Sequence, residues 1–179
     1  MLLHVVQIIH PISSLAAVRR DVLTQLVALG AVAGAAAIAY FFAIRQRRMD
    51  EKKATCARAV TDALAWLELP YRIRRRMNSD PETLHNLADQ MHQLQERLLF
   101  DQNWMLVELL QAERSYSILV AAVKQAAEQP LRDAWLAPPV ENPSGMNIGS
   151  LGIPSVESEL RSFASDARRR LSWWKLWQE

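Results

Sequence analysis

Four residues with metal-binding or acid–base side chains recur at helical spacing in the middle of the chain. His85, Asp89, His92 and Glu96 fall at positions i, i+4, i+7 and i+11, which places them on one face of a predicted helix. Glu82 and His85, like Asp89 and His92, have the carboxylate-x-x-His spacing of di-metal helical bundles. Such a centre needs the same pair from a second helix, and the remaining histidines of the sequence lie within the first ten residues. We therefore expect a hydrated helix face and no cofactor, with metal ligation as a remote alternative.

The sequence lacks the short motifs of common catalytic sites. It contains no G-x-x-x-x-G-K-[ST] phosphate loop, no G-x-S-x-G nucleophile elbow and no H-E-x-x-H zinc motif. Cys56 is the single cysteine, so an intrachain disulfide is impossible. Its place on an apolar helical stripe favours a small core residue over a reactive thiol. These features favour a protein that is not an enzyme.

Charge is distributed unevenly along a chain whose formal net charge is only +2. Residues 45–76 hold ten basic and four acidic side chains, a net of +6, whereas residues 80–141 hold four basic and ten acidic ones, a net of −6. Two such arms can attract each other within one chain or between two chains. The arginine cluster at 72–76 has no recognition helix or stacking platform beside it. We expect a solvated or lipid-facing basic patch there and not a nucleic-acid site.

The chain is organised around one apolar stretch, Val22 to Ile44. These 23 residues carry no formal charge, and a helix of that length measures roughly 35 Å, enough to cross a hydrocarbon layer of about 30 Å. Alanine and glycine supply ten of the residues, so a buried core helix is the competing interpretation. A cleaved signal peptide fits less well, because the run is too long and lacks a small-residue cleavage site. We predict one transmembrane helix over 22–44.

The flanks of this predicted span indicate its orientation. Two basic residues precede it, whereas six follow it between Arg45 and Arg58, which places the C-terminal side in the cytoplasm and the N-terminus outside. Residues 1–21 are interpreted as an interfacial tail. Within the span, Gly30 and Gly34 form a G-x-x-x-G pair that Ala37 extends, so this face could associate with a second copy.

Residues 45–136 are predicted to form a cytoplasmic helical region. Pro70 should end or kink its first helix, and Ser79 or Asp80, followed by Pro81, should start the next one. Pro130 should close the last. Two apolar stripes with helical spacing follow position 82: Leu84, Leu87, Met91, Leu94, Leu98, and then Met105, Leu109, Ala112, Tyr116, Leu119, Val123, Ala126. We favour two antiparallel helices with a corner between Phe100 and Leu110, although one continuous helix remains open.

The C-terminal part divides into a linker and an amphipathic helix. Residues 137–154 contain four prolines and three glycines and are predicted to be a linker whose apolar residues could lie against the helices. Residues 155–179 are predicted to be a helix capped by Ser155. Its end pairs cationic side chains with tryptophans, as interfacial helices do: Arg168, Arg169, Arg170, Trp173, Trp174, Lys175 and Trp177. We favour the membrane surface for this segment over packing on the other helices.

The sequence therefore predicts an all-α protein with a single transmembrane helix, a cytoplasmic helical hairpin or small bundle, and a C-terminal amphipathic helix. The predicted function is a membrane-anchored scaffold or adaptor. It would contact the lipid bilayer, self-associate as a homo-oligomer, or bind an unidentified cytoplasmic protein through its helices. The alternative is a membrane-perturbing effector, pore-forming or holin-like, that uses the small-residue face of the span.

Overall fold

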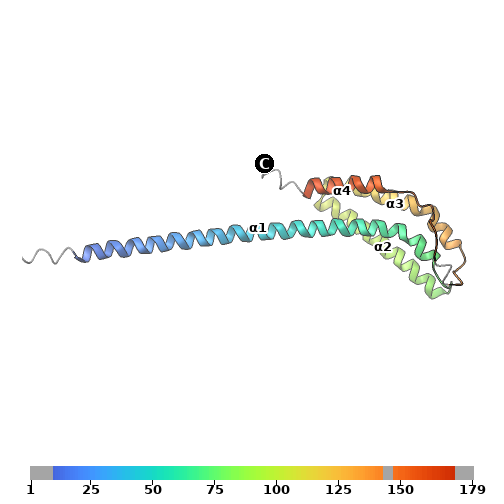
Figure 1. Cartoon of the computed structure of the whole chain (residues 1–179), viewed down its shortest axis with the longest axis horizontal. Coiled ribbons are helices and arrows are strands. Elements are labelled where there is room, and N and C mark those ends of the chain that lie inside the picture. Colours follow the sequence, from blue (N-terminus) through green and yellow to red (C-terminus); the bar gives the residue numbers. More distant parts are fainter. Residues whose placement is uncertain (1–9, 143–146, 172–179) are drawn as a thin grey trace, which may run out of the picture. The chain divides into compact units, whose positions relative to one another are not determined.

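The computed structural model describes residues 10–142 and 147–171. Within these ranges every regular element is a helix, as the sequence predicts, and no strand occurs (Figure 1). The helices are α1 (His10–Arg74), α2 (Pro81–Glu108), α3 (Leu110–Leu136) and α4 (Glu157–Leu171). The chain divides into an N-terminal unit, residues 1–49, and a C-terminal unit, residues 50–179.

In the N-terminal unit, the apolar part of α1 is exposed along its length among the residues that the structure describes. Val27, Leu29 and Val32 are all largely exposed, and no residue of the most apolar 18-residue window is buried. Among the described helices, α1 is the one long and apolar enough to cross a membrane. A helix at the core of a soluble domain would be covered by other elements. Part of the predicted tail, residues 1–9, lies outside the described residues, and α1 already includes the remainder from His10.

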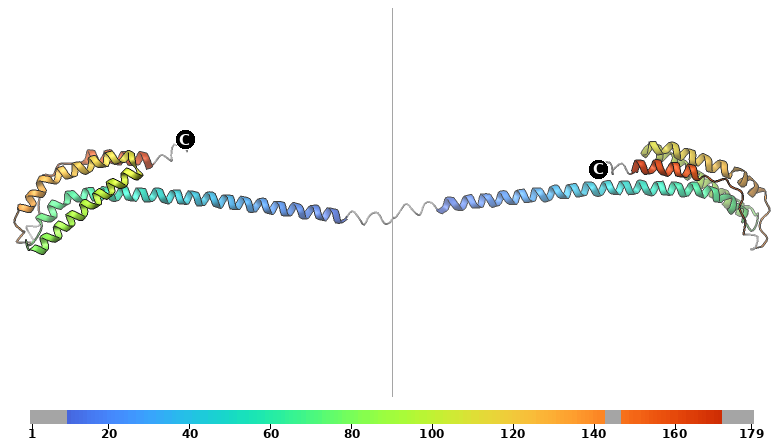
Figure 2. Two further views of the ribbon diagram at one scale, coloured as in Figure 1. Left: turned by 180° about the vertical axis from the view of Figure 1, so that it is seen from behind. Right: turned by 45° about the horizontal axis from the view of Figure 1, so that its top comes forward.

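In the C-terminal unit, α2 runs antiparallel to the last part of α1 (Figure 2). Three ion pairs join the two helices: Lys52–Glu108 at 2.8 Å, Arg58–Asp101 at 2.7 Å and Asp62–Arg97 at 3.1 Å. The residue numbers rise along α1 as they fall along α2, which fixes both the direction and the register of the pairing.

All four helices contribute to one apolar core in this unit. On α1 the buried apolar side chains recur every three or four residues. Of the first predicted stripe on α2, Leu94 and Leu98 are buried, whereas Leu84, Leu87 and Met91 are partly buried. All seven residues of the second predicted stripe, from Met105 to Ala126, are buried. From α4 the ring of Phe163 packs against Tyr116, with 5.2 Å between the ring centroids. The apolar face of α4 is therefore covered by the core.

The corner between α2 and α3 lies at Leu109, within the predicted interval. Its backbone, with φ −142° and ψ 53°, is not helical, and α2 and α3 are thus two separate helices. The Leu109 amide donates to the Met105 carbonyl at 2.8 Å, and the Leu109 carbonyl accepts from Ala112 at 2.7 Å. Asp101, near the start of the predicted interval, lies inside α2 with its side chain in the core.

Two prolines that should interrupt helices are accommodated within them. α1 continues past Pro70 to Arg74, and α3 continues past Pro130 to Leu136, so the prediction that Pro130 closes its helix is wrong. A proline inside a helix costs about 3 kcal/mol through a lost hydrogen bond and a clash with the preceding turn. Packing of buried residues in the adjacent turns offsets that cost: Leu69 and Ile73 near Pro70, and Ala127 and Ala134 near Pro130. Figure 1 shows both helices bending toward their C-terminal ends, which agrees with the kink considered for Pro70.

Side-chain caps mark the starts of α2 and α4, and the linker contacts α1. Asp80 is the N-cap of α2, its carboxylate accepting from the Thr83 amide at 2.7 Å, with Pro81 at the first helical position. The Ser155 hydroxyl accepts from the amide of Glu157 at the start of α4. The described part of the linker runs along the helices, where the Leu151 amide donates to the Tyr71 hydroxyl at 3.2 Å.

Candidate functional site

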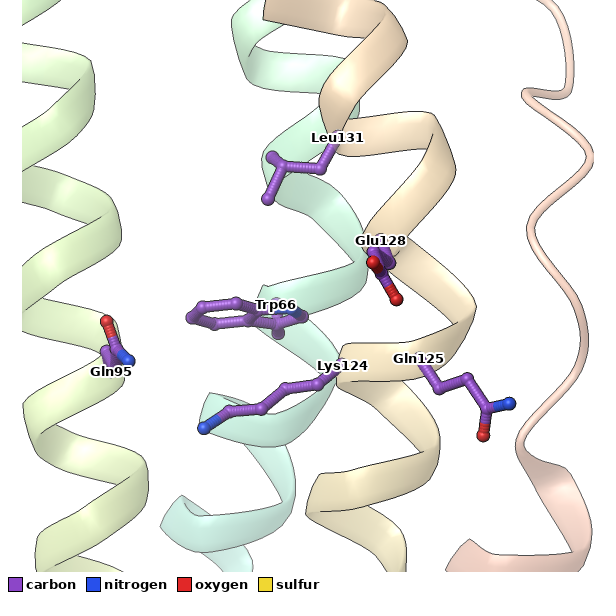
Figure 3. A pocket seen from close by; sticks show the side chains of 6 residues that line it. All are labelled: Trp66, Gln95, Lys124, Gln125, Glu128 and Leu131. Atoms are coloured by element: carbon purple, nitrogen blue, oxygen red, sulfur yellow. The ribbon is translucent and has the colours of Figure 1, made fainter.

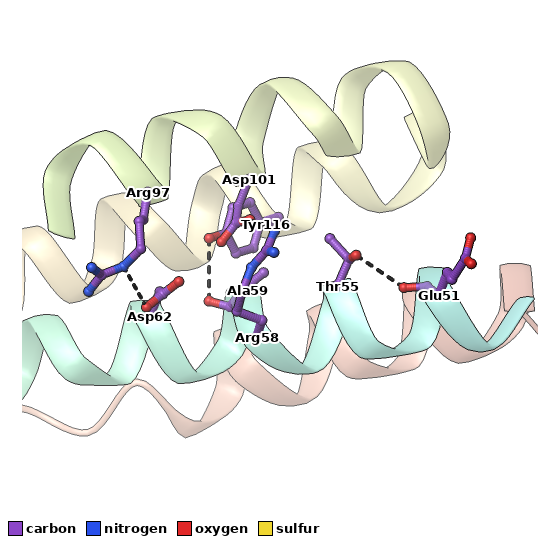
Figure 4. Close-up of polar contacts among 8 residues, drawn as sticks. All are labelled: Glu51, Thr55, Arg58, Ala59, Asp62, Arg97, Asp101 and Tyr116. Carbon is purple, nitrogen blue, oxygen red and sulfur yellow. Dashed lines mark hydrogen bonds and ion pairs between the residues drawn. The ribbon is translucent and has the colours of Figure 1, made fainter. Parts of the chain in front are cut away.

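A cluster of polar side chains is buried where α1, α2 and α3 meet (Figure 4). Its centre is Asp101, whose side chain is only 1% exposed. On α2 this residue occupies the apolar stripe between Leu98 and Met105, a position where the helical pattern calls for an apolar side chain. A buried charged residue at such a position either forms an ion pair that joins the helices or belongs to a functional site. The residues that contact it distinguish the two cases.

Two arginine–carboxylate pairs form the charged part of the cluster. Arg58 donates to Oδ1 of Asp101 at 2.7 Å, and Nε of Arg97 donates to Oδ1 of Asp62 at 3.1 Å. Both arginine side chains are about half exposed, so each pair joins a buried anion to a cation that also contacts water. In each carboxylate the second oxygen, Oδ2, is buried without a hydrogen-bond partner among the described residues. The carboxylates are thus only half satisfied, which costs stability while favouring one register of α1 against α2.

The pKa of Asp101 follows from this geometry. Burial raises it above its ordinary value, and the hydrogen bond and charge of Arg58 counteract part of that rise. The bond to Asp101 in turn raises the pKa of Arg58. The charge of Arg58 therefore favours the ionised form of the Asp101 carboxylate, against the effect of burial.

Tyr116 and Cys56 complete the cluster on its apolar side. The Tyr116 hydroxyl donates to the carbonyl of Ala59 at 3.3 Å, which ties α3 to α1. Burial, followed by the nearby carboxylates, raises the pKa of Tyr116 well above its usual value. Burial and the charge of Asp101 raise the pKa of the Cys56 thiol to about 11. A protonated, buried thiol is a poor nucleophile, so Cys56 is the small core residue that the sequence predicts.

Arg76 corrects the interpretation of the arginine cluster as a surface patch. Its side chain is buried, and its guanidinium donates to four carbonyls at the ends of two helices: Ile73 at 3.0 Å, Ala134 at 2.9 Å, Trp135 at 3.4 Å, and Ala137. The last carbonyls of a helix have no partner within it, and they carry the negative end of the helix dipole. One cation thus caps the C-terminal ends of both α1 and α3. The neighbouring Arg72 and Arg75 are exposed.

A surface pocket of about 390 Å³ lies beside the core, between α1, α2 and α3 (Figure 3). It is lined by Trp66, Gln95, Lys124, Gln125, Glu128 and Leu131. The ammonium of Lys124 lies 5.5 Å from the centre of the Trp66 ring and already uses that face in a cation–π contact. Glu128, on the same rim, pairs with Arg132 at 3.4 Å, so both charged side chains that line the pocket already have partners within the protein.

The four residues weighed as a remote metal-site candidate lie on the exposed surface of α2. His85 and Asp89 lie 3.4 Å apart and His92 and Glu96 lie 3.2 Å apart, each an i, i+4 pair with both side chains more than half exposed. In the described ranges no three His, Cys, Asp or Glu side chains are grouped so as to hold a metal ion. Their geometry is that of ordinary surface pairs along a helix.

The predicted lipid-contact and association residues are placed only in part. A Cβ added at Gly30 or Gly34 would meet no atom within 4 Å, so this face is open. Arg168, Arg169 and Arg170 lie exposed in the last turn of α4, while Trp173, Trp174, Lys175 and Trp177 lie outside the described residues. The apolar side chains of residues 157–171 pack on the core, so they are not available to lipid, and the expected membrane contact of residues 168–177 stays a prediction.

The buried cluster and Arg76 were not apparent from the sequence. A charged residue on an otherwise apolar stripe, as at Asp101, was the available signal. A comparison of the sequence with family models found no match, and searches of curated proteins and of solved structures found none either.

Proposed function

We propose that this protein is a single-pass, membrane-anchored scaffold or adaptor. The apolar part of α1 is the anchor, and the C-terminal unit presents helices on the cytoplasmic side, where they self-associate or bind a protein partner. The observation that carries the proposal is the bare apolar surface of α1, none of whose most apolar window is buried. A surface of this length has to be removed from water, and a bilayer matches it in both thickness and chemistry.

The charge distribution supports the orientation. Six basic residues follow the apolar stretch closely and two precede it, the asymmetry that keeps the more basic flank in the cytoplasm. The same basic residues suit the anionic lipids of a cytoplasmic leaflet.

The composition of the span favours an anchor over a pore. A water-filled pore needs a continuous polar lining, and between Val22 and Ile44 the polar side chains are limited to Thr24, Gln25 and Tyr40. These lie at the two ends of the stretch. A membrane-perturbing effector, in which the small-residue face assembles the spans, is the alternative function.

The anchor and its orientation are tested together on the full chain. Reporter domains fused before residue 1 and after residue 179 should place the C-terminus in the cytoplasm, and alkaline carbonate should leave the protein in the membrane pellet. A C-terminus outside would overturn the orientation, and release into the supernatant would overturn the anchor.

Self-association through the span is tested by a matched pair of double variants. Gly30→Leu with Gly34→Leu should weaken crosslinked oligomers, because the added side chains keep the two backbones apart. Ala31→Leu with Ala35→Leu has the same spacing, turned by about 100° around the helix, and should leave crosslinking unchanged. Oligomers that persist in the glycine variant would move the association to the C-terminal unit. Depolarisation of cells on expression, with the glycine variant silent, would favour the effector.

A further inference from the structure

The outer face of the corner between α2 and α3 carries a group of exposed apolar side chains. Each is at least half exposed, and Val107 is the most exposed at 80%. We call this group the corner patch; its members are Leu99, Phe100, Leu106, Val107 and Leu110. The four on α2 fall within about 120° of the helix circumference, opposite the buried Leu98, Asp101 and Met105. The last turns of α2 are thus apolar on two opposite sides, of which the core covers one. An apolar group of this kind on a surface marks a site of interaction.

The position of the corner patch along the chain indicates what covers it. The 2.8 Å ion pair between Lys52 and Glu108 holds the end of α2 beside residue 52. Residue 52 lies eight residues after Ile44, where the apolar stretch ends. Eight helical residues measure about 12 Å, and even a fully extended chain would reach no further than about 28 Å. The other end of the patch lies beside Arg58, which is 5.8 Å from the centre of the Phe100 ring and 14 residues after Ile44, about 21 Å along a helix. Chain length therefore keeps the Val107 end of the patch nearest the leaflet that α1 leaves, whose headgroup layer is about 5 to 7 Å thick.

The charges around the patch fit an anionic lipid surface. The connecting stretch carries Arg45, Arg47, Arg48, Lys52 and Lys53, and Arg114 is exposed one turn after Leu110 on α3. Two acidic residues, Asp50 and Glu51, lie in the same stretch, so residues 45–53 carry five basic and two acidic side chains, a net of +3. Lys53 pairs with Asp50 at 3.3 Å and Lys52 with Glu108 at 2.8 Å, while Glu113 accepts from the hydroxyl of Ser117 at 2.7 Å. Basic side chains around exposed leucine, valine and phenylalanine are the composition of interfacial membrane contacts.

We infer that the corner patch lies in the headgroup layer of the leaflet next to Ile44, so that the C-terminal unit contacts the membrane at a second point. This inference rests on the proposed anchor, because without a membrane-inserted α1 the chain does not hold the patch near lipid. The second contact restricts the C-terminal unit to a limited set of orientations above the bilayer. The surfaces of α3 and α4 away from the corner then face the cytoplasm, where a partner can reach them.

The test uses the full chain reconstituted into vesicles of phosphatidylcholine and phosphatidylglycerol. In a Cys56→Ala background, Val107→Cys and, as a matched control, Leu136→Cys are each labelled with an environment-sensitive fluorophore. Val107 and Leu136 are almost equally exposed, at 80% and 79%. Val107 lies on α2, just before the start of α3, and Leu136 is the last residue of α3. We expect a blue-shifted emission at position 107 and strong quenching by brominated lipid, with neither effect at position 136.

Three outcomes would contradict the inference in distinguishable ways. Equal, water-like emission at both positions in carbonate-resistant protein would overturn the second contact while leaving the anchor intact. A blue shift at position 107 that resists brominated lipid and grows with the protein-to-lipid ratio would show that a second copy of the chain covers the patch. Release of the labelled protein by carbonate would overturn the anchor and, with it, the inference.

Discussion

Replacing Arg58 tests the idea that the buried cluster depends on its arginines. The change Arg58→Met keeps the apolar stem of the side chain and removes the charge that Asp101 faces. Asp101 then remains almost fully buried with neither carboxylate oxygen bonded, because Oδ2 already lacks a partner among the described residues. Breaking a buried pair in this way costs about 3 kcal/mol. For a helical unit of this size, such a loss lowers the melting temperature by roughly 10 °C.

The opposite change should cost much less. In Asp101→Asn the amide oxygen can still accept from Arg58, and a half-exposed arginine can return to water. We expect a loss of about 1 kcal/mol or less, since removing a poorly satisfied buried charge offsets the weaker hydrogen bond. Arg58→Met should therefore destabilise the protein more than Asp101→Asn does. In a surface ion pair, removing either partner would cost about the same stability.

The effect of Arg58→Met should also depend on pH. Burial already raises the pKa of Asp101, and removing Arg58 raises it further. Because the folded pKa then exceeds the unfolded one, the folded state binds a proton more readily, and stability falls as the pH rises through the folded pKa. The loss of unfolding free energy caused by Arg58→Met should thus be largest at neutral pH and smaller in mild acid. Adding Asp101→Asn to Arg58→Met should remove this pH dependence, because the titrating carboxyl is then absent.

The assay is thermal unfolding of the full chain in a mild detergent, followed by circular dichroism at neutral and mildly acidic pH. Arg132→Met is the matched control, because Arg132 pairs with Glu128 at 3.4 Å and both side chains are about two-thirds exposed. Such a pair contributes roughly 0.5 kcal/mol or less. The reasoning would be refuted if Arg58→Met were no more destabilising than Arg132→Met, or if its effect were the same at both pH values.

Three further changes probe the contacts that join the helices, each measured by the same thermal unfolding. Arg76→Met should lower stability by about 3 kcal/mol or more, because it leaves several carbonyls at the ends of α1 and α3 unpaired; a loss no greater than that of the exposed Arg75→Met would contradict this role. Tyr116→Phe should cost about 1 kcal/mol, the value of its bond to Ala59, and an unchanged melting temperature would show that the bond contributes nothing. Phe163→Ala should cost about 3 to 5 kcal/mol by opening a cavity under α4, and it should make α4 sensitive to limited proteolysis before the rest of the chain; uniform cleavage would argue against independent release of α4.

Much of the local structure could be predicted from periodicity and capping. The stripe from Met105 to Ala126 identified a buried face correctly because helical spacing is a property of neighbouring residues. Asp80 followed by Pro81 located the start of α2, and the corner fell inside the predicted interval. Cys56 was correctly assigned to the core. Each of these features is determined by residues that are close together in the sequence, within about one helical turn or along one face of one helix.

The features that could not be predicted depend on partners far along the chain. Asp101 is tolerated in the core because Arg58, 43 positions earlier, reaches it. Arg76 is buried because carbonyls 58 to 61 positions later need a donor. Pro70 and Pro130 remain inside helices because packing outweighs the local cost. None of these pairings leaves a periodic signal in the sequence, and a single sequence does not say which distant segments meet.

The distance along the chain between the parts of the core also sets an order of events during synthesis. The apolar stretch of α1 is made early and can enter the membrane while the rest of the chain is still missing. The core that Ala59 and Ala63 of α1 share has its last buried member, Ala167, on α4. At about 5 to 20 residues per second, the 93 residues that follow Arg74 up to Ala167 take roughly 5 to 20 s. If α1 is the proposed anchor, the nascent chain presents during that interval an amphipathic helix whose apolar face is only partly covered, where a chaperone or a second nascent copy would meet it.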